Sequence, residues 1–158
     1  MRVACVGIYF KIPSERIAAS IAEYTPQNNR SQIRQTENNR LLLDYYNANP
    51  TGMKESLRNF FEQIQGPKMV ILGDMFELGD AAPHEHAEIV KLLLDQTDVE
   101  RIVTGKEFYR AAKDKPGIRA FEEIEELKKH IAMLSPKNLF ILIKGSRGMK
   151  MEQLTELL

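Results

Sequence analysis

The sequence has 158 residues, of which 43% are hydrophobic and 28% are charged, a composition typical of a soluble globular domain. Its 22 basic and 22 acidic side chains balance, so neither a nucleic-acid surface nor an anionic-membrane surface is expected. The single cysteine, Cys5, excludes an internal disulfide, and the apolar runs are far shorter than the roughly 20 residues that span a bilayer. We therefore predict a cytoplasmic protein without a membrane span.

The first 30 residues differ in pattern from the remainder. A helix is predicted from Ile12 to Tyr24, with Ser14 as its cap, because apolar side chains recur four residues apart. Residues 25–29 then form a polar, turn-rich stretch typical of a linker. We expect residues 1–30 to be the end of one domain plus a linker, and residues 31–158 to form a second domain.

Four short apolar runs predict buried strands, and they start roughly 30 to 40 residues apart, as in strand–helix–strand units. They are Leu41–Leu43, Met69–Leu72, Ile102–Val103 and Leu139–Ile143. A further strand is possible at Ser31–Thr36. Helical patterns lie between and after them, at Met53–Ile64, Ile89–Leu94, Phe121–Leu134 and Met151–Leu158. This alternation predicts an α/β fold, a Rossmann-like and mostly parallel sheet with helices on both faces.

Three of the four strands run into polar loops at their carboxyl ends. These loops are Asp44–Pro50 (DYYNANP), Gly73–Gly79 (GDMFELG) and Lys144–Gly148 (KGSRG). Each has a structural explanation by itself; Asn49, for example, is suited to cap a helix. The carboxyl ends of parallel strands share one edge of the sheet, and ligands bind at that edge in open α/β folds. Three such loops on one edge therefore predict a shared binding site.

Several other motifs are excluded or have structural explanations. Glu100 stands where a phosphate-binding loop ending at Gly105-Lys106 would need its first glycine, so an independent ATPase is disfavoured. His84 and His86 point about 200° apart on a helix, so no metal site is predicted, and His86 is interpreted as a packing or hydrogen-bonding residue. The acidic run Glu122–Glu126 is interpreted as a solvated helix face.

The three loops resemble the motifs of the C-terminal domain in the Mur ligase family, in the branch that joins D-alanyl-D-alanine to UDP-N-acetylmuramoyl-tripeptide. The DYYNANP, LGDMFELG and KGSRG strings occur in that order, with Arg30 in the linker and His86 on the helix after the second motif. Tyr45 stands where the family usually has serine. The resemblance covers nearly the whole chain.

The resemblance implies an ATP-dependent peptide ligase of peptidoglycan synthesis. ATP and Mg²⁺ would be held mainly by a central domain, to which residues 1–30 would belong, and the other partners would be both substrates and an N-terminal domain. It implies nucleotide contacts from Arg30, Asp44, Tyr46 and Asn47. From the position of the loops, and from the need for cations near the free carboxylate of D-alanyl-D-alanine, we expect substrate contacts from Asn49, Asp74, Glu77, Lys144, Ser146 and Arg147. No catalytic residue is assigned within this chain, which is expected to be inactive alone.

Two alternatives remain open. A sister Mur ligase would add a different amino acid, although such enzymes tend to have a histidine within the Asn47–Pro50 string. A non-catalytic flavodoxin-like binding domain would use Asp44 and Asp74 as an acidic pocket. That second alternative explains neither Arg30 nor the loop that begins at Lys144.

Overall fold

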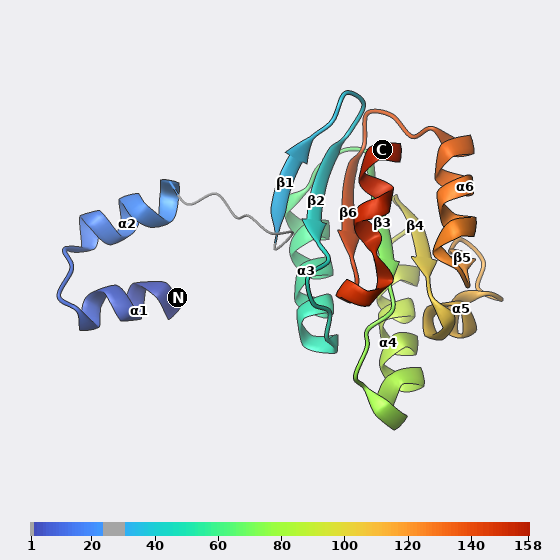
Figure 1. Ribbon diagram of the computed structural model, residues 1–158, viewed down its shortest axis with the longest axis horizontal. Coiled ribbons are helices and arrows are strands. Elements are labelled where there is room, and N and C mark those ends of the chain that lie inside the picture. Colours follow the sequence, from blue (N-terminus) through green and yellow to red (C-terminus); the bar gives the residue numbers. More distant parts are fainter. Residues whose placement is uncertain (1, 24–30) are drawn as a thin grey trace.

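The computed structural model describes residues 2–23 and 31–158 (Figure 1). The helices are α1 (Arg2–Tyr9), α2 (Ser14–Glu23), α3 (Pro50–Gln63), α4 (Ala82–Leu94), α5 (Lys106–Ala112) and α6 (Ile124–Leu134), with 3₁₀ turns η1 (Gly79–Ala81), η2 (Arg147–Met149) and η3 (Met151–Leu157). The strands are β1 (Gln32–Gln35), β2 (Arg40–Asp44), β3 (Lys68–Gly73), β4 (Val99–Thr104), β5 (Arg119–Phe121) and β6 (Phe140–Lys144).

The six strands form one sheet in the order β1-β2-β6-β3-β4-β5. Strand β1 pairs antiparallel with β2, and every other pair is parallel. The predicted α/β class and mostly parallel sheet are therefore confirmed. Because β6 lies between β2 and β3, the polar loops that follow these three strands are neighbours in space although they are far apart in sequence.

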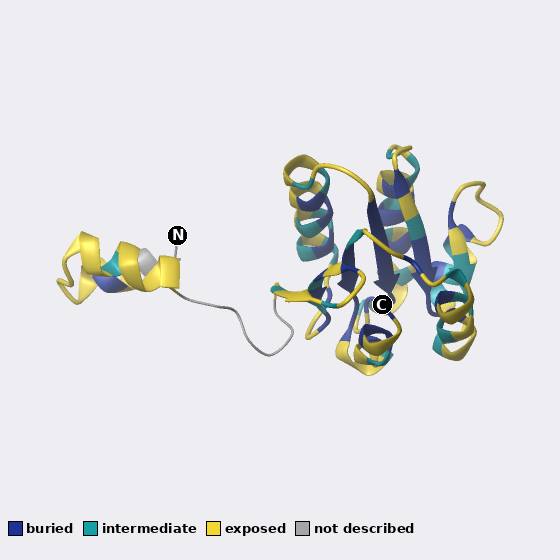
Figure 2. Ribbon diagram, turned by 90° about the horizontal axis from the view of Figure 1, so that it is seen from above, coloured by how far each residue is buried: buried dark blue, intermediate teal, exposed yellow. Residues whose placement is uncertain are grey.

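The sheet carries a hydrophobic core on each face. Side chains alternate along β3, so Met69 and Ile71 pack with α6 and η3, whereas Val70 and Leu72 pack with α3, α4 and α5. All four side chains are fully buried. Figure 2 shows the buried strands between helices whose outer sides are exposed. Burial on both faces explains why the central strands are near-continuous apolar runs in the sequence.

Some elements differ from the sequence-based predictions. Helix α2 begins at Ser14 and not at Ile12. Phe121, predicted to open a helix, lies in β5, a three-residue strand at the sheet edge, and α6 begins at Ile124. Helices α1 and α5 were not predicted, and the C-terminal helix is of the 3₁₀ type. The unpredicted helices α1 and α5 have only 8 and 7 residues, so neither carries a clear periodic pattern of its own.

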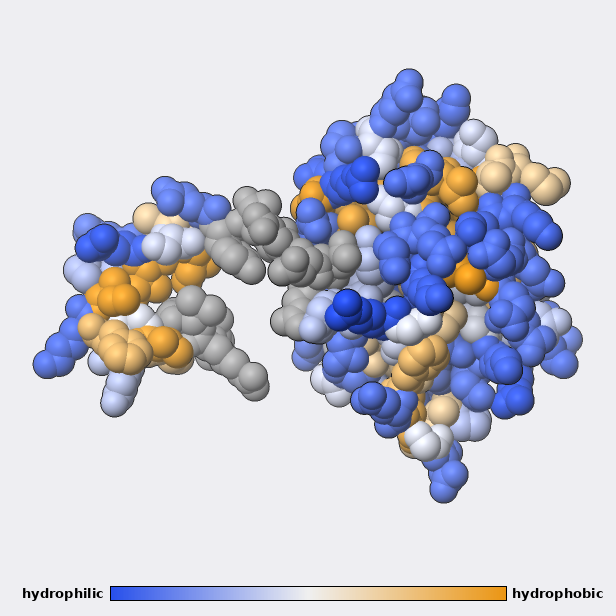
Figure 3. Space-filling model, viewed as in Figure 1, coloured by the Kyte–Doolittle hydropathy of each residue, from blue (hydrophilic) through white to orange (hydrophobic). Residues whose placement is uncertain are grey.

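Helices α1 and α2 form a pair with a largely exposed apolar surface. Gly7 lies against Ile17, whose side chain would touch any Cβ at that position. Ile8, Phe10 and Ile21 are exposed, by 67%, 68% and 48%. Figure 3 shows hydrophobic atoms gathered on this helix pair. Among the described helices, none is both long and apolar enough to cross a membrane.

Candidate functional site

A cavity of about 490 Å³ opens at the carboxyl ends of four neighbouring parallel strands, β6, β3, β4 and β5. We call it the edge cavity. One loop from each strand lines it, with residues 74–76, 105–107, 122–124 and 148–150. The cavity therefore lies where the strand order predicts a ligand site in an open α/β sheet.

Asp74, directly after β3, holds the start of α5. Its carboxylate oxygens accept hydrogen bonds from the amides of Glu107 (3.0 Å) and Phe108 (2.9 Å). The side chain thus satisfies two amides that a helix N-terminus leaves without internal partners. Burial, the largest influence, raises the pKa of Asp74, while the two amide hydrogen bonds act in the opposite direction.

Gly105 makes this arrangement possible. Its backbone has a φ of +110°, and a Cβ at this position would lie 2.3 Å from the carboxyl carbon of Asp74. No side chain fits there without displacing the carboxylate. The loops after β3 and β6 also approach closely, because a Cβ on Gly145 would lie 3.1 Å from the Cα of Gly73. Glycine at these positions lets the backbones around the cavity pack together.

His86 holds the loop after β3 from the opposite side. Its Nδ1 lies 2.7 Å from the carbonyl oxygen of Ala82, and its Nε2 accepts a hydrogen bond from the amide of Met75 (3.0 Å). These two contacts assign a neutral ring with the proton on Nδ1. The ring is fully buried and meets Phe108 edge to face, with centroids 4.6 Å apart. The interpretation of His86 as a packing and hydrogen-bonding residue is confirmed.

Ser146 joins the loops after β3 and β6. Its hydroxyl accepts a hydrogen bond from the amide of Phe76 (2.8 Å), and its own amide donates to the carbonyl oxygen of Asp74 (3.1 Å). The side chain is 5% exposed. The polar loop after β6 therefore supports the wall of the edge cavity.

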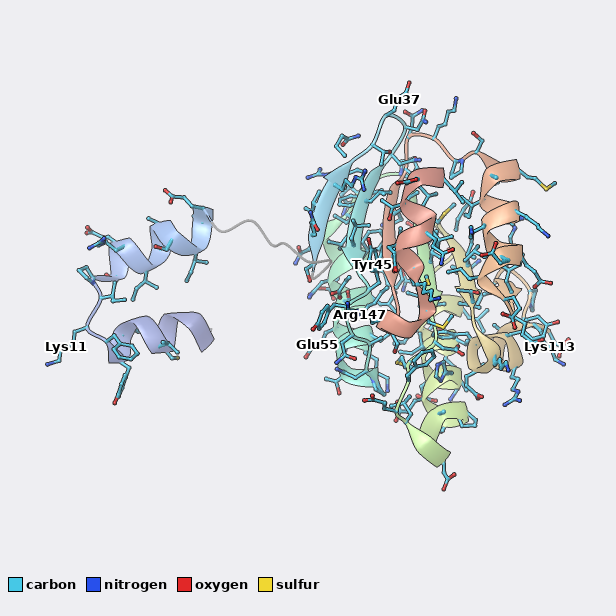
Figure 4. The ribbon with its side chains drawn as sticks, viewed as in Figure 1. Lys11, Glu37, Tyr45, Glu55, Lys113 and Arg147 are labelled. Atoms are coloured by element: carbon cyan, nitrogen blue, oxygen red, sulfur yellow. The ribbon has the colours of Figure 1, made fainter. Side chains whose placement is uncertain are left out.

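A second groove, of about 520 Å³, lies between α3 and strands β1 and β2, and we call it the α3 groove. Asp44 and Lys144 form an ion pair there, at paired positions of the neighbouring strands β2 and β6. Asp44 also accepts a hydrogen bond from the amide of Ser31 (3.3 Å). In the loops that follow these two strands, the guanidinium of Arg147 lies 5.5 Å from the ring centre of Tyr46. Figure 4 shows Arg147 at the turn that follows β6.

The sequence-based site residues divide among several places. Of these residues, Asp74 alone lines the edge cavity, while Asp44 and Lys144 line the α3 groove. Asn49 caps α3 by accepting from the amide of Gly52 (2.8 Å). Asn47, Glu77 and Arg147 are exposed, and Arg30 lies outside the described residues. The ion pair joins Asp44, which was predicted to contact the nucleotide, to Lys144, which was predicted to contact the peptide substrate.

Sequence reasoning missed most of the cavity lining. The charged lining residues that it did not assign to the site are Lys106, Glu107, Glu122, Glu123 and Lys150. Glu122 and Glu123 are exposed, as a solvated face requires, but they also line the cavity. One signal in the sequence could have indicated these residues. The strand predicted at Ile102-Val103 ends at the same edge of the sheet, so the loop after it was also a candidate for the site. Among residues 2–23 and 31–158, no cluster of three or more His, Cys, Asp or Glu could hold a metal ion.

The fold and the edge cavity together define an α/β domain with a cavity at the carboxyl edge of a mostly parallel sheet. Residues 29–147 match the family model described as "Mur ligase, glutamate ligase domain". This chain belongs to the Mur ligase family.

Similar proteins within the family carry a more specific name. The UDP-N-acetylmuramoyl-tripeptide–D-alanyl-D-alanine ligase of Rickettsia prowazekii is 33% identical, over 88% of this chain and 32% of its own length. MurF from Acinetobacter baumannii has a similar structure, with a TM-score of 0.81 and 26% identity over 96% of this chain and 34% of its own. MurF ligase from Thermotoga maritima, solved with ADP, shares the fold (TM-score 0.78, 24% identity, covering 97% and 35%). The chain spans about a third of the length of these relatives.

Proposed function

We propose that this chain is the C-terminal domain of a ligase that joins D-alanyl-D-alanine to UDP-N-acetylmuramoyl-tripeptide, in the cytoplasm. The names of the similar proteins support this proposal, as do the three loop motifs. Residues 1–30 would then be the end of the central ATP-binding domain plus a linker. The exposed apolar side chains of α1 and α2 suit that role, because a packed domain would cover them.

The charge pattern of the edge cavity is the observation that carries the proposal. D-alanyl-D-alanine has a free carboxylate at one end and an amine at the other. Lys106 and Lys150 line the cavity with cations, and Glu107, Glu122 and Glu123 line it with carboxylates. A zwitterionic dipeptide therefore finds partners for both ends within one cavity. A hydrogen bond to a charged group contributes about 1.5–3 kcal/mol, so each such contact changes affinity roughly 10- to 150-fold.

The α3 groove suits the nucleotide. Asp44, at the carboxyl end of β2, is placed to accept from a ribose hydroxyl, and Lys144 beside it offers a cation to a phosphate. Because these two side chains are paired, we place Lys144 with the nucleotide and not with the peptide. When bound, ATP would supply the phosphoryl group that activates the tripeptide carboxylate, and a central domain would hold Mg²⁺. This chain would orient the dipeptide amine and exclude water.

The test separates the two sites in the complete ligase. We expect Lys106→Ala to raise the Michaelis constant for the dipeptide about 10- to 150-fold, with little effect on that for ATP. Asp44→Ala is expected to raise the Michaelis constant for ATP, with little effect on that for the dipeptide. Lys113→Ala is the matched control, since this lysine is exposed at the end of α5 and does not line the cavity (labelled in Figure 4). An unchanged dipeptide constant in both Lys106→Ala and Lys150→Ala would refute the assignment.

The same assay decides between the proposal and a sister Mur ligase. A sister enzyme would join a single amino acid in place of the dipeptide. Sister ligases share this fold at 11% and 16% identity, which says nothing about the substrate. Ligation of a single amino acid in preference to D-alanyl-D-alanine would favour the sister.

A further inference from the structure

Phe76 is a half-exposed aromatic side chain on the wall of the edge cavity. It is 45% exposed, whereas the two residues before it, Asp74 and Met75, are 5% and 2% exposed. The ring and its neighbour Gly148 both line the cavity. Three other apolar residues, Met75, Ile124 and Met149, also line the cavity, but each is less exposed than Phe76.

Two hydrogen bonds hold the backbone that leads into Phe76. The amide of Met75 donates to His86, and the amide of Phe76 donates to Ser146. Glu77, the next residue, has a φ of +64°, a left-handed conformation that non-glycine residues seldom adopt. Buried partners therefore hold the backbone of Phe76 in position, although the ring itself faces open space. A rigid support of this kind is what a binding surface requires.

Gly148 limits where the ring can lie. A Cβ at Gly148 would be 2.5 Å from Cε2 of Phe76 and 3.2 Å from Cδ2. The edge of the ring thus rests directly on the backbone of the loop after β6. Because Gly148 has no side chain, the ring of Phe76 lies closer to this loop than it could with any other amino acid at position 148.

We propose that Phe76 is a specificity-determining residue that limits the size of the dipeptide side chains accepted by the edge cavity. The proposal rests on the function proposed above. The ring contacts the methyl groups of D-alanyl-D-alanine while the charged lining holds its two ends. A larger side chain would collide with the ring, whose edge lies against Gly148 and whose own amide, like that of Met75, is hydrogen-bonded to a buried side chain.

The experiment measures kcat/KM of the complete ligase for D-alanyl-D-alanine and for D-alanyl-D-valine. One methylene group in an apolar pocket changes selectivity about 10- to 200-fold. We therefore expect Phe76→Ala to lower the preference for D-alanyl-D-alanine by on the order of 10-fold or more. Phe76→Leu should lower it less, and both should keep the Michaelis constant for ATP. Leu92→Ala, at a residue 37% exposed on α4 that lines a different groove, is the control and should keep the preference.

Gly148→Ala provides an independent test of the ring position. The new methyl group displaces the ring, so it should change the dipeptide preference in the otherwise unaltered enzyme. In the Phe76→Ala background it meets no ring and should have no further effect, which makes the two substitutions strongly non-additive. This comparison remains valid if Phe76→Ala folds poorly, because Phe76→Leu can replace it.

The outcomes separate the two proposals. An unaltered enzyme that does not ligate D-alanyl-D-alanine would refute the function itself. An active enzyme whose preference survives both Phe76 substitutions would refute the role of Phe76 and leave the function standing. Additive effects of the Phe76 and Gly148 substitutions would also refute the role of Phe76.

Discussion

Gly105→Ala is the substitution expected to disturb the edge cavity most. Gly105 has φ +110° and ψ 160°, a region essentially restricted to glycine, so an alanine there costs about 1–3 kcal/mol. Its Cβ would also lie 2.3 Å from Cγ of Asp74 and 2.5 and 2.6 Å from the two carboxylate oxygens. The carboxylate must then leave the amides of Glu107 and Phe108, and losing a helix cap costs about 0.5–2 kcal/mol. We expect a total destabilisation of roughly 2–5 kcal/mol.

Urea unfolding of the 158-residue chain, followed by circular dichroism, measures this cost. Gly66→Ala is the matched control, because Gly66 has a φ of +85° and a Cβ added there would meet no atom within 4 Å. Gly66→Ala should lower the free energy of unfolding only by the cost of a left-handed backbone at alanine, about 1–2 kcal/mol. The excess destabilisation of Gly105→Ala over Gly66→Ala then includes the displacement of Asp74.

A double-substitution cycle isolates that displacement. In an Asp74→Ala background the new methyl group has no carboxylate to displace, so Gly105→Ala should cost only the backbone term. The coupling between the two substitutions should be about 1–2 kcal/mol. Equal costs of Gly105→Ala in both backgrounds would show that Asp74 does not anchor α5, and the account of the cavity wall would be wrong.

Three further predictions follow from individual contacts. Asn49→Ala should destabilise the chain by about 1 kcal/mol in urea, because α3 loses its cap, whereas the exposed Asn47→Ala should change stability by less than about 0.5 kcal/mol. Burial raises the pKa of Asp74. The free energy of unfolding of the unaltered chain, relative to that of Asp74→Asn, should therefore be greatest in acid and fall as the pH rises through that pKa. A relative stability that instead increases with pH would mean that the amide bonds outweigh burial. Finally, the 158-residue chain alone should release no phosphate from ATP above background, even with Mg²⁺ and both substrates, because it contains no phosphate-binding loop sequence.

The sheet was largely predictable because its central strands are buried on both faces. Strands such as β3 and β6 must be apolar at nearly every position, and that pattern is visible without any tertiary information. Helix α3 was equally visible, since Asn49 and Pro50 mark its start. Local signals of this kind specify an element before it packs.

Helix α5 shows why other elements were missed. It has seven residues, and its N-cap position is Gly105, which has no side chain to cap it. The capping oxygens come from Asp74, which lies 33 residues before Glu107 in the sequence. No local pattern could indicate this helix, because the interaction that fixes its start exists only after β3 and β4 have paired.

The same long-range contact changes how the site should be interpreted. The edge of the sheet was predictable from topology, but Asp74 was expected to face the peptide substrate, and both of its oxygens are already bonded to α5. A substrate ammonium would have to compete with two backbone amides for this buried carboxylate. The amine of a bound dipeptide is therefore better matched by Glu122 and Glu123, which line the cavity and are exposed, than by Glu107, which is paired with Arg110. Asp74 would act on the ligand indirectly, by fixing the position of Lys106 and Glu107 at the start of α5.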